Sequence, residues 1–198
     1  MIQNDPTPRL LAFAGSRRSG SWNRKLLHEA LRLAGEREIS VTGIELADYP
    51  MPLYDGDMEQ TSGLPDNAVR LKQLMHEHDG FVIVAPEYNA SIPPLLKNTL
   101  DWVSRSHDPA LGRLEPYRGK LAALLSASPG RFGGMRGLRH LRDVLTTLGV
   151  TVLPGDFSLS RAPEAFDERG QLREEHAQRV AGVILRIADM TTRLRMSA

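Results

Sequence analysis

The chain has 198 residues, of which 41% are hydrophobic and 25% charged, with a formal net charge of +1 and no cysteine. This composition is typical of a globular protein, and its length predicts one domain over residues 1–198. The absence of cysteine excludes disulfides, thiolate metal sites and cysteine nucleophiles, so any redox chemistry requires a bound cofactor.

The balanced charge and the lack of long apolar runs exclude several kinds of partner. A net charge of +1 gives no general attraction to nucleic acid or lipid. No apolar run approaches the roughly 20 residues of a membrane span. Residues 1–6 are polar, whereas a signal peptide begins basic and continues apolar. We therefore expect a cytoplasmic protein that binds neither nucleic acid nor a membrane.

The first predicted strand leads into a loop that can bind an anion. Residues 10–14 are continuously apolar, as a strand buried on both faces of a parallel sheet must be, and Gly15 then allows a sharp turn. A helix capped by Ser21 or Asn23 should follow, because its apolar residues recur at helical spacing. These are Leu26, Leu27, Ala30, Leu31 and Ala34. This order places backbone N–H groups and a positive helix end around one point, as in phosphate sites.

The loop matches neither of two common phosphate-binding motifs. The dinucleotide fingerprint Gly-x-Gly-x-x-Gly fails because position 17 is Arg, and a Walker A loop fails because Ser21 follows Gly20 where Lys is required. The remaining donors suit a terminal phosphomonoester, although an ordinary Ser/Arg surface loop explains this stretch equally well. The donors are Ser16, Arg17, Arg18, Ser19, Ser21 and Asn23.

Strand and helix patterns alternate through the middle of the chain. Residues 38–46 alternate apolar and polar positions, as an edge strand does. Residues 47–65 are rich in Pro and Gly and predict a long loop, typical of a lid or binding segment. A helix over 66–77, an apolar strand over 80–85 and a helix over 95–105 follow.

The same alternation continues to the C-terminus. The sequence predicts a strand over 120–126, a Gly-rich loop over 127–134 and an amphipathic helix over 135–148. A short fifth strand near 150–153 and a long helix over about 171–193 complete the pattern. This alternation predicts an α/β fold with a parallel sheet.

Three loops follow the ends of apolar strands, at Gly15, Pro86 and Ala127. In an open doubly wound sheet these ends share one edge, where ligands bind. The second loop offers Tyr88 as a flat surface, and the Gly-rich third loop lets its backbone approach a planar ring. A phosphate at the first loop and a flat heterocycle between the others describe a mononucleotide such as FMN.

Three stretches resemble a known family. They are Gly-Ser-x-Arg-x-x-Ser-x-Asn over 15–23, Pro-Glu-Tyr-Asn over 86–89 and Leu-Lys-Asn-x-x-Asp-Trp-x-Ser-Arg over 96–105. Together they resemble motifs of the NADPH-dependent FMN reductase family, which includes bacterial quinone, chromate and azo-dye reductases. The resemblance implies a flavodoxin-like three-layer sandwich. Its five-stranded parallel sheet, in the order 2-1-3-4-5, would have helices on both faces.

By position, the resemblance also implies which residues bind FMN. The phosphate would be bound by Ser16, Arg18, Ser21 and Asn23, with Trp22 included in the cofactor site. The ribityl chain and ring would be lined, mostly through backbone, by Pro86, Glu87, Tyr88 and Asn89. A looser match adds Ser126, Ser128 and Gly130. Arg17 departs from the family pattern, in which an aliphatic residue is more usual at that position.

The activity implied by the resemblance is a two-electron transfer from NADPH or NADH to quinones, chromate, azo compounds or free flavin. The flavin carries the chemistry, so no side-chain acid or base is required. The six histidines form no ligand set, and we assign no metal. Family resemblance further implies a homodimer or homotetramer, for which Trp102 is a plausible interface anchor.

Two alternatives are a flavodoxin-type electron carrier and a flavin-binding regulatory module. In carriers of this fold, the loop after the third strand commonly contains a Gly whose peptide flips during one-electron chemistry. Residues 86–90 contain no Gly. Because positive φ costs a non-Gly residue about 1–2 kcal/mol, this loop favours the reductase.

Overall fold

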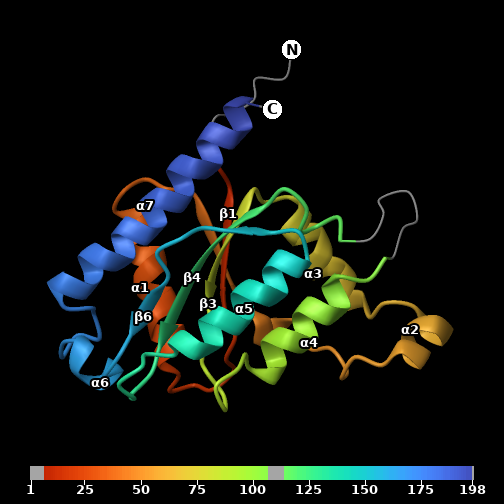
Figure 1. Ribbon diagram of the computed structural model, residues 1–198, viewed down its shortest axis with the longest axis horizontal. Coiled ribbons are helices and arrows are strands. Elements are labelled where there is room, and N and C mark those ends of the chain that lie inside the picture. The colour runs from red at the N-terminus through yellow and green to blue at the C-terminus, as the bar shows by residue number, and fades with distance from the viewer. Residues whose placement is uncertain (1–6, 107–113, 198) are drawn as a thin grey trace.

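The computed structural model describes residues 7–106 and 114–197. The polar start at residues 1–6, interpreted above as unlike a signal peptide, lies outside the described residues. The described chain forms one parallel sheet with helices on both faces (Figure 1). The strands are β1 (Leu10–Ala14), β2 (Val41–Glu45), β3 (Gly80–Val84), β4 (Leu121–Ala127), β5 (Thr151–Val152) and β6 (Phe157–Leu159).

The sheet has the order β2-β1-β3-β4-β5, which confirms the flavodoxin-like topology expected from the sequence. β1 lies between β2 and β3, and β3 lies between β1 and β4. The pairs β1–β2, β1–β3 and β3–β4 are all parallel. Every residue of β1, β3 and β4 is buried, because helices cover both faces of these strands. Their carboxyl ends therefore meet at one edge, at the bottom of Figure 1.

The fifth position of the sheet differs from the prediction, because it is shared by two short strands. β5 pairs with the first two residues of β4, and β6 pairs with residues 125–127 of the same strand. Pro154 and Gly155 lie between them; proline has no N–H to donate, and Gly155 has φ 90°. β6 has three residues, too short a run for the apolar pattern to reveal.

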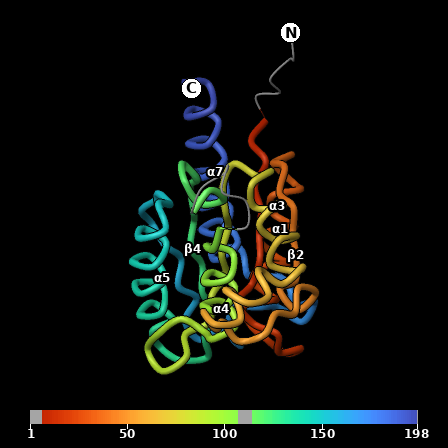
Figure 2. The backbone as a smooth tube through the Cα atoms, turned by 90° about the vertical axis from the view of Figure 1, so that its right-hand side faces the viewer, coloured from red at the N-terminus to blue at the C-terminus, as the bar shows by residue number. Residues whose placement is uncertain are grey.

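Helices cover the two faces of the sheet as separate layers. α1 (Trp22–Gly35) and α7 (Glu174–Ser197) pack on one face. α3 (Asp66–His76), α4 (Pro94–Val103) and α5 (Met135–Thr147) pack on the other. Figure 2 is seen from the α4 side and shows α5, α4 and α3 spread in that order across the sheet. The predicted C-terminal helix is correct in type, but it begins and ends a few residues later.

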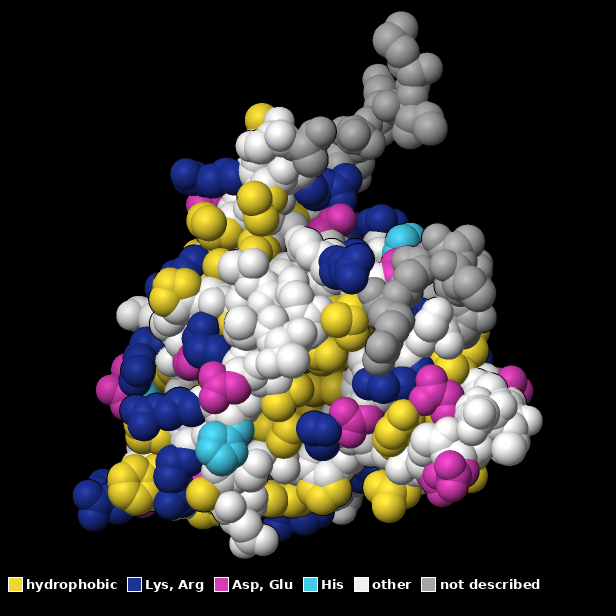
Figure 3. All heavy atoms as spheres, turned by 45° about the vertical axis from the view of Figure 1, so that its right-hand side comes forward, with side chains coloured by type: hydrophobic (Ala, Val, Ile, Leu, Met, Phe, Trp, Pro, Cys, Tyr) yellow, Lys and Arg dark blue, Asp and Glu magenta, His cyan; other side chains and the backbone are white. Residues whose placement is uncertain are grey.

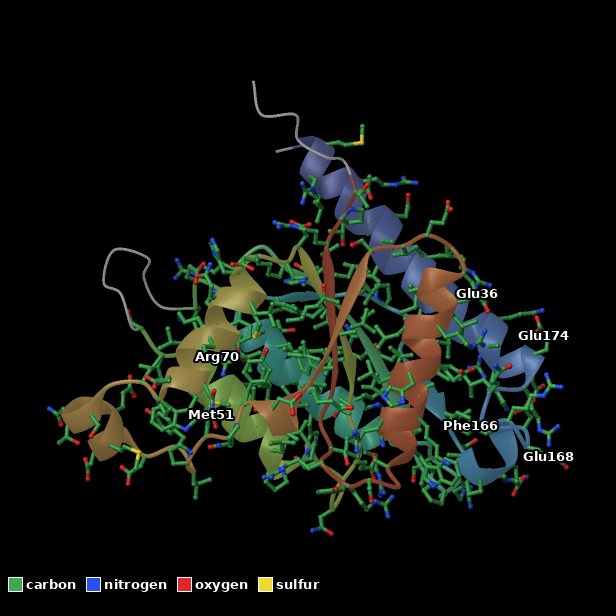
Figure 4. The ribbon with its side chains drawn as sticks, turned by 180° about the vertical axis from the view of Figure 1, so that it is seen from behind. Glu36, Met51, Arg70, Phe166, Glu168 and Glu174 are labelled. Atoms are coloured by element: carbon green, nitrogen blue, oxygen red, sulfur yellow. The ribbon has the colours of Figure 1, made fainter. Side chains whose placement is uncertain are left out.

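The segment predicted as a loop over 47–65 contains helical turns. η1 (Leu46–Asp48) is a short 3-10 helix. α2 (Gly56–Ser62) is capped by Asp55, whose carboxylate accepts hydrogen bonds from the N–H groups of Asp57 and Met58. α2 has no buried residue, so periodicity could not reveal it. Figure 4 shows Met51 on the segment that leads to α2, and Arg70 on α3.

The chain before α2 is fixed to α4 by side-chain hydrogen bonds. The Asn98 amide donates to the Pro52 carbonyl at 2.8 Å and accepts from the Tyr54 N–H at 2.7 Å. Trp102 also donates to the Pro52 carbonyl and is fully buried, with the Tyr54 ring packed edge-on at 5.0 Å. The expectation that Trp102 anchors an interface is therefore wrong: it binds the protein's own chain.

Asn23, at the start of α1, joins this helix to the end of β4. Its amide donates to the Ala127 carbonyl at 2.8 Å, and its side-chain oxygen accepts from the Ala127 N–H at 2.9 Å. Both residues are buried. A backbone group that loses its only partner in such a place is costly to leave unpaired.

Asn23→Ala should therefore lower the free energy of unfolding of the flavin-free protein by about 2 kcal/mol. Urea denaturation followed by circular dichroism measures the change. Asn67→Ala is the matched control, since the Asn67 amide donates to the Pro50 carbonyl at an exposed site, and about 0.5 kcal/mol or less is expected there. Equal losses for the two variants would contradict the structural role of Asn23.

Candidate active site

The loops after β1, β3 and β4 converge on one cleft at the carboxyl edge of the sheet. Its volume is about 310 Å³, within the range of about 300–1,000 Å³ usual for small-molecule sites. Most of the residues expected to bind the cofactor line it. The lining residues are Ser16, Arg18, Ser21, Trp22, Asn23, Pro86, Glu87, Tyr88, Ala127, Ser128 and Pro129.

The start of α1 offers backbone donors without acceptors. Ser21 occupies the N-cap position, as predicted, yet its side chain makes no capping hydrogen bond. No acidic residue lies in the first turn, and within the described chain the N–H groups of residues 22–24 donate to no protein atom. The buried Ser16 and the exposed Arg18 lie beside them. Free N–H groups, the positive helix end and a guanidinium together can hold a phosphate.

Gly15 is required at this loop for a reason that differs from the prediction. It does not adopt positive φ; it continues the pairing of β1 by donating to the Val84 carbonyl at 2.9 Å. A Cβ atom there would lie 3.1 Å from the Pro93 side chain and 3.2 Å from Leu96. The glycine therefore lets the loop approach the start of α4 closely.

Trp22 forms a side wall of the cleft. Its ring stacks on Phe166 with 5.5 Å between the centroids, and the Lys25 ammonium lies 4.5 Å from its centroid. Phe166 follows α6 (Ala162–Ala165) and is labelled near the lower end of α1 in Figure 4. Nothing in the sequence indicated Phe166, because its role depends on where α6 packs.

Asn23 lines the cleft but has both amide atoms engaged with Ala127. The motif placed it among the phosphate ligands. The structure gives its side chain a different task, because it fixes the first loop to the third. Its backbone N–H, in contrast, points from the open start of α1 with no protein acceptor.

The second loop is a tight turn closed by two hydrogen bonds. The N–H groups of Tyr88 and Ser91 each donate to the other residue's carbonyl at 2.9 Å. Asn89 and Ala90 between them have φ values of 50° and 64°. The loop therefore adopts positive φ at two residues although it contains no Gly, since the paired hydrogen bonds offset the cost. The Tyr88 ring stays 47% exposed at the cleft.

Glu87 lines the cleft, but its carboxylate is bound by the start of α5. It accepts from the N–H groups of Arg136 and Gly137 at 3.0 and 3.1 Å, and from the Arg136 side chain at 2.8 Å. Burial acts to raise the pKa of Glu87, but the hydrogen bonds from Arg136 and Gly137 outweigh it, so the pKa lies below its usual value. Glu87 thus stabilises the start of α5 as an anion.

The third loop brings its three predicted residues to different depths. Ser128 lines the cleft and accepts from the exposed Gly130 N–H at 3.1 Å. Ser126 is fully buried, and its hydroxyl has no hydrogen-bond partner in the described structure. A Cβ atom on Gly134 would lie 1.9 Å from the Ser126 oxygen, so the glycine permits close packing there. Ser126 and Gly130 are absent from the cleft lining, as is Asn89.

These residues fit FMN in both of its parts. The phosphate end matches the open start of α1, where no carboxylate competes for the donors. A planar ring matches the space lined by Pro86 and Tyr88 of the second loop and by Ser128 and Pro129 of the third. Over residues 7–106 and 114–197, no three His, Asp or Glu residues are grouped to hold a metal ion. No helix in the same part of the chain is long and apolar enough to cross a membrane.

Comparison with known proteins agrees with this site. The model of the family described as NADPH-dependent FMN reductase matches residues 8–164. The chain is 38% identical over 172 residues to an NAD(P)H-dependent FMN reductase of Pseudomonas aeruginosa, covering 86% of this chain and 87% of that protein. It is 36% identical over 145 residues to a quinone reductase of Escherichia coli K12, covering 73% and 72%.

A solved structure supports the same conclusion. FerB of Paracoccus denitrificans, a flavoenzyme NAD(P)H:(acceptor) oxidoreductase, superposes with a TM-score of 0.80 at 26% identity, covering 94% of this chain and 98% of its own. The family model spans most of the described fold, including all three loops of the cleft. The chain belongs to the NADPH-dependent FMN reductase family.

Proposed function

We propose that the protein transfers two electrons from NADPH or NADH, through a bound FMN, to quinones or other small acceptors such as chromate, azo compounds or free flavin. The observation that carries this proposal is the open start of α1, with its free N–H groups facing a flat-sided cleft. The names of the relatives favour the reductase over an electron carrier or a regulatory module. The location that we propose is the cytoplasm, where reduced nicotinamides are available.

Bound FMN supplies the redox chemistry, and the chain supplies binding and orientation. Arg18, Ser16 and Ser21 hold the phosphate together with the start of α1. Pro86 and Tyr88 lie against the ring. In the described structure, the N–H groups of Asn89 and Ala90 donate to no protein atom. They remain available to stabilise negative charge on a reduced ring, and the closed turn keeps them in place.

The assignment of Arg18 to the phosphate can be tested with two flavins. Arg18→Ala should weaken FMN binding by roughly 10- to 100-fold, because a charge-assisted hydrogen bond to the phosphate is lost. Riboflavin has no phosphate, so its affinity should change little. Flavin fluorescence titration of the flavin-free protein measures both constants. Parallel losses for the two flavins would show that Arg18 acts on folding instead.

The reductase and the electron carrier differ in their reaction with nicotinamide. We expect the FMN-loaded protein to oxidise NADPH or NADH rapidly when benzoquinone is present, with ping-pong kinetics, because both substrates would react with the same flavin in the same cleft. Stopped-flow mixing with NADPH alone should bleach the flavin absorbance. Stable absorbance after mixing, with no quinone-dependent turnover, would reject the enzyme and favour a carrier or regulatory module.

We also propose that the protein forms a homodimer or homotetramer, for which Leu53 is a suitable anchor. The Leu53 side chain is 81% exposed. Its neighbours Pro52 and Tyr54 are held to Asn98 by two hydrogen bonds, so this large apolar side chain is presented on a fixed backbone. A segment whose backbone is already fixed loses less entropy when a partner covers it.

Leu53→Glu should weaken self-association, because an interface would bury the new charge. Light scattering at micromolar concentration measures the particle mass. Leu185→Glu, at a 48% exposed position on α7, is the matched control and should leave the mass unchanged. A wild-type particle of 22.0 kDa would contradict self-association itself.

A further inference from the structure

Two arginines have no part in the function proposed so far: Arg131 lies in the third loop, and Arg161 lies between β6 and α6. Arg131 and Arg161 are both exposed, and the Arg161 N–H donates to the carbonyl of Gly130 at 3.3 Å. This hydrogen bond brings Arg161 beside the residue that precedes Arg131. In the described chain neither arginine pairs with a carboxylate, whereas their neighbour Arg136 is neutralised by Glu87. Two exposed arginines on neighbouring stretches of backbone, with no carboxylate partner in the described chain, are suited to bind an anion.

The backbone around the two arginines is held firmly. Ser128 donates to the Leu159 carbonyl and accepts from the Ala162 N–H, both at 3.0 Å. Gly133 lies so near residues 158–160 that a Cβ atom would be 2.8 Å from their backbone. Arg161 has φ 47° and ψ 45°, a left-handed conformation that is uncommon for Arg and is often retained at ligand sites.

Phe132 adds an exposed aromatic surface beside Arg131. Its side chain is 47% exposed, with the Arg131 and Arg136 guanidinium carbons 5.1 and 5.2 Å from the ring centroid. Figure 3 shows Lys and Arg side chains gathered with hydrophobic ones at the lower left, at the end of the molecule where the loops lie. An aromatic ring flanked by guanidinium groups is suited to stack on a nucleotide base.

We propose that Arg131 and Arg161 bind the 2′-phosphate of NADPH, with the adenine on Phe132, and so make the protein select NADPH over NADH. This rests on the proposed function, which places the nicotinamide in the adjoining cleft. Ser128 and Pro129 line that cleft and belong to the same loop as Arg131. NADPH differs from NADH by one phosphomonoester of about −2 charge, and a pair of unneutralised arginines distinguishes that group from a hydroxyl.

Redox-inert fragments test the site without turnover. Calorimetric titration of the FMN-loaded protein should show that adenosine 2′,5′-bisphosphate binds at least about tenfold more tightly than 5′-ADP. Arg131→Gln and Arg161→Asn should each remove most of this preference and leave 5′-ADP little changed. Asparagine is chosen at position 161 because it tolerates the left-handed backbone.

Arg118→Ala is the control, since Arg118 is also exposed and lacks a carboxylate partner in the described chain. It precedes β4, at the opposite edge of the sheet from the cleft, and should leave the preference unchanged. Arg131→Lys should recover part of it, because the charge returns without the guanidinium fork. Flavin content and circular dichroism identify any variant that fails to fold, and such a variant is replaced by its lysine counterpart.

Steady-state kinetics separate the failure of this inference from the failure of the proposed function. In the variants, the KM for NADPH should rise roughly tenfold or more, whereas the KM for NADH and kcat stay near wild type. Equal affinity of the wild-type protein for the two fragments, or equal losses for both nicotinamides, would overturn the phosphate site alone. Absence of oxidation of either nicotinamide would overturn the proposed function.

Discussion

The pair of hydrogen bonds between the Asn23 amide and the Ala127 backbone sets the geometry on which the cleft depends. It joins the start of α1, which is open for an anion, to the end of β4, where the third loop begins. The parallel sheet brings the carboxyl ends of β1 and β4 to the same edge, but β3 lies between these two strands. The side chain of Asn23 spans that separation, so the two loops keep a fixed relation that backbone pairing alone cannot supply.

The sequence predicted the sheet well and the local details less well, for a physical reason. Continuous burial makes β1, β3 and β4 visible as apolar runs, and their order follows from the α/β alternation and the family resemblance. β6 and α2 were missed because neither carries an apolar periodicity of sufficient length. Each is stabilised by contacts distant in sequence, β6 by pairing with β4 and the chain before α2 by hydrogen bonds to Asn98 and Trp102.

At the candidate site, the motif identified the correct neighbourhood but could not separate a ligand from its support. Ser16, Ser21 and Arg18 lie where a phosphate site needs them, and this remains a prediction until binding is measured. Glu87 belongs to the second motif, at residues 86–89, yet its carboxylate stabilises α5 at a distance of 49 residues in sequence. Such partners are fixed by packing between elements. A linear pattern contains no information about which direction a polar side chain takes from its loop.

The second loop shows how a fixed turn can serve two-electron chemistry. Its lack of Gly indicated a stiff segment, and the turn is indeed closed, although its stiffness comes from a different source. Asn89 and Ala90 already occupy positive φ, and the reciprocal hydrogen bonds of Tyr88 and Ser91 hold them there. Reversing the central peptide involves none of the four backbone groups of this pair, but with Asn89 at φ 50° it would require a ψ range that is essentially restricted to Gly. The free N–H groups at the tip of the turn therefore keep one orientation. This favours two-electron transfer, because the protein around the ring does not rearrange between the oxidised and the fully reduced flavin.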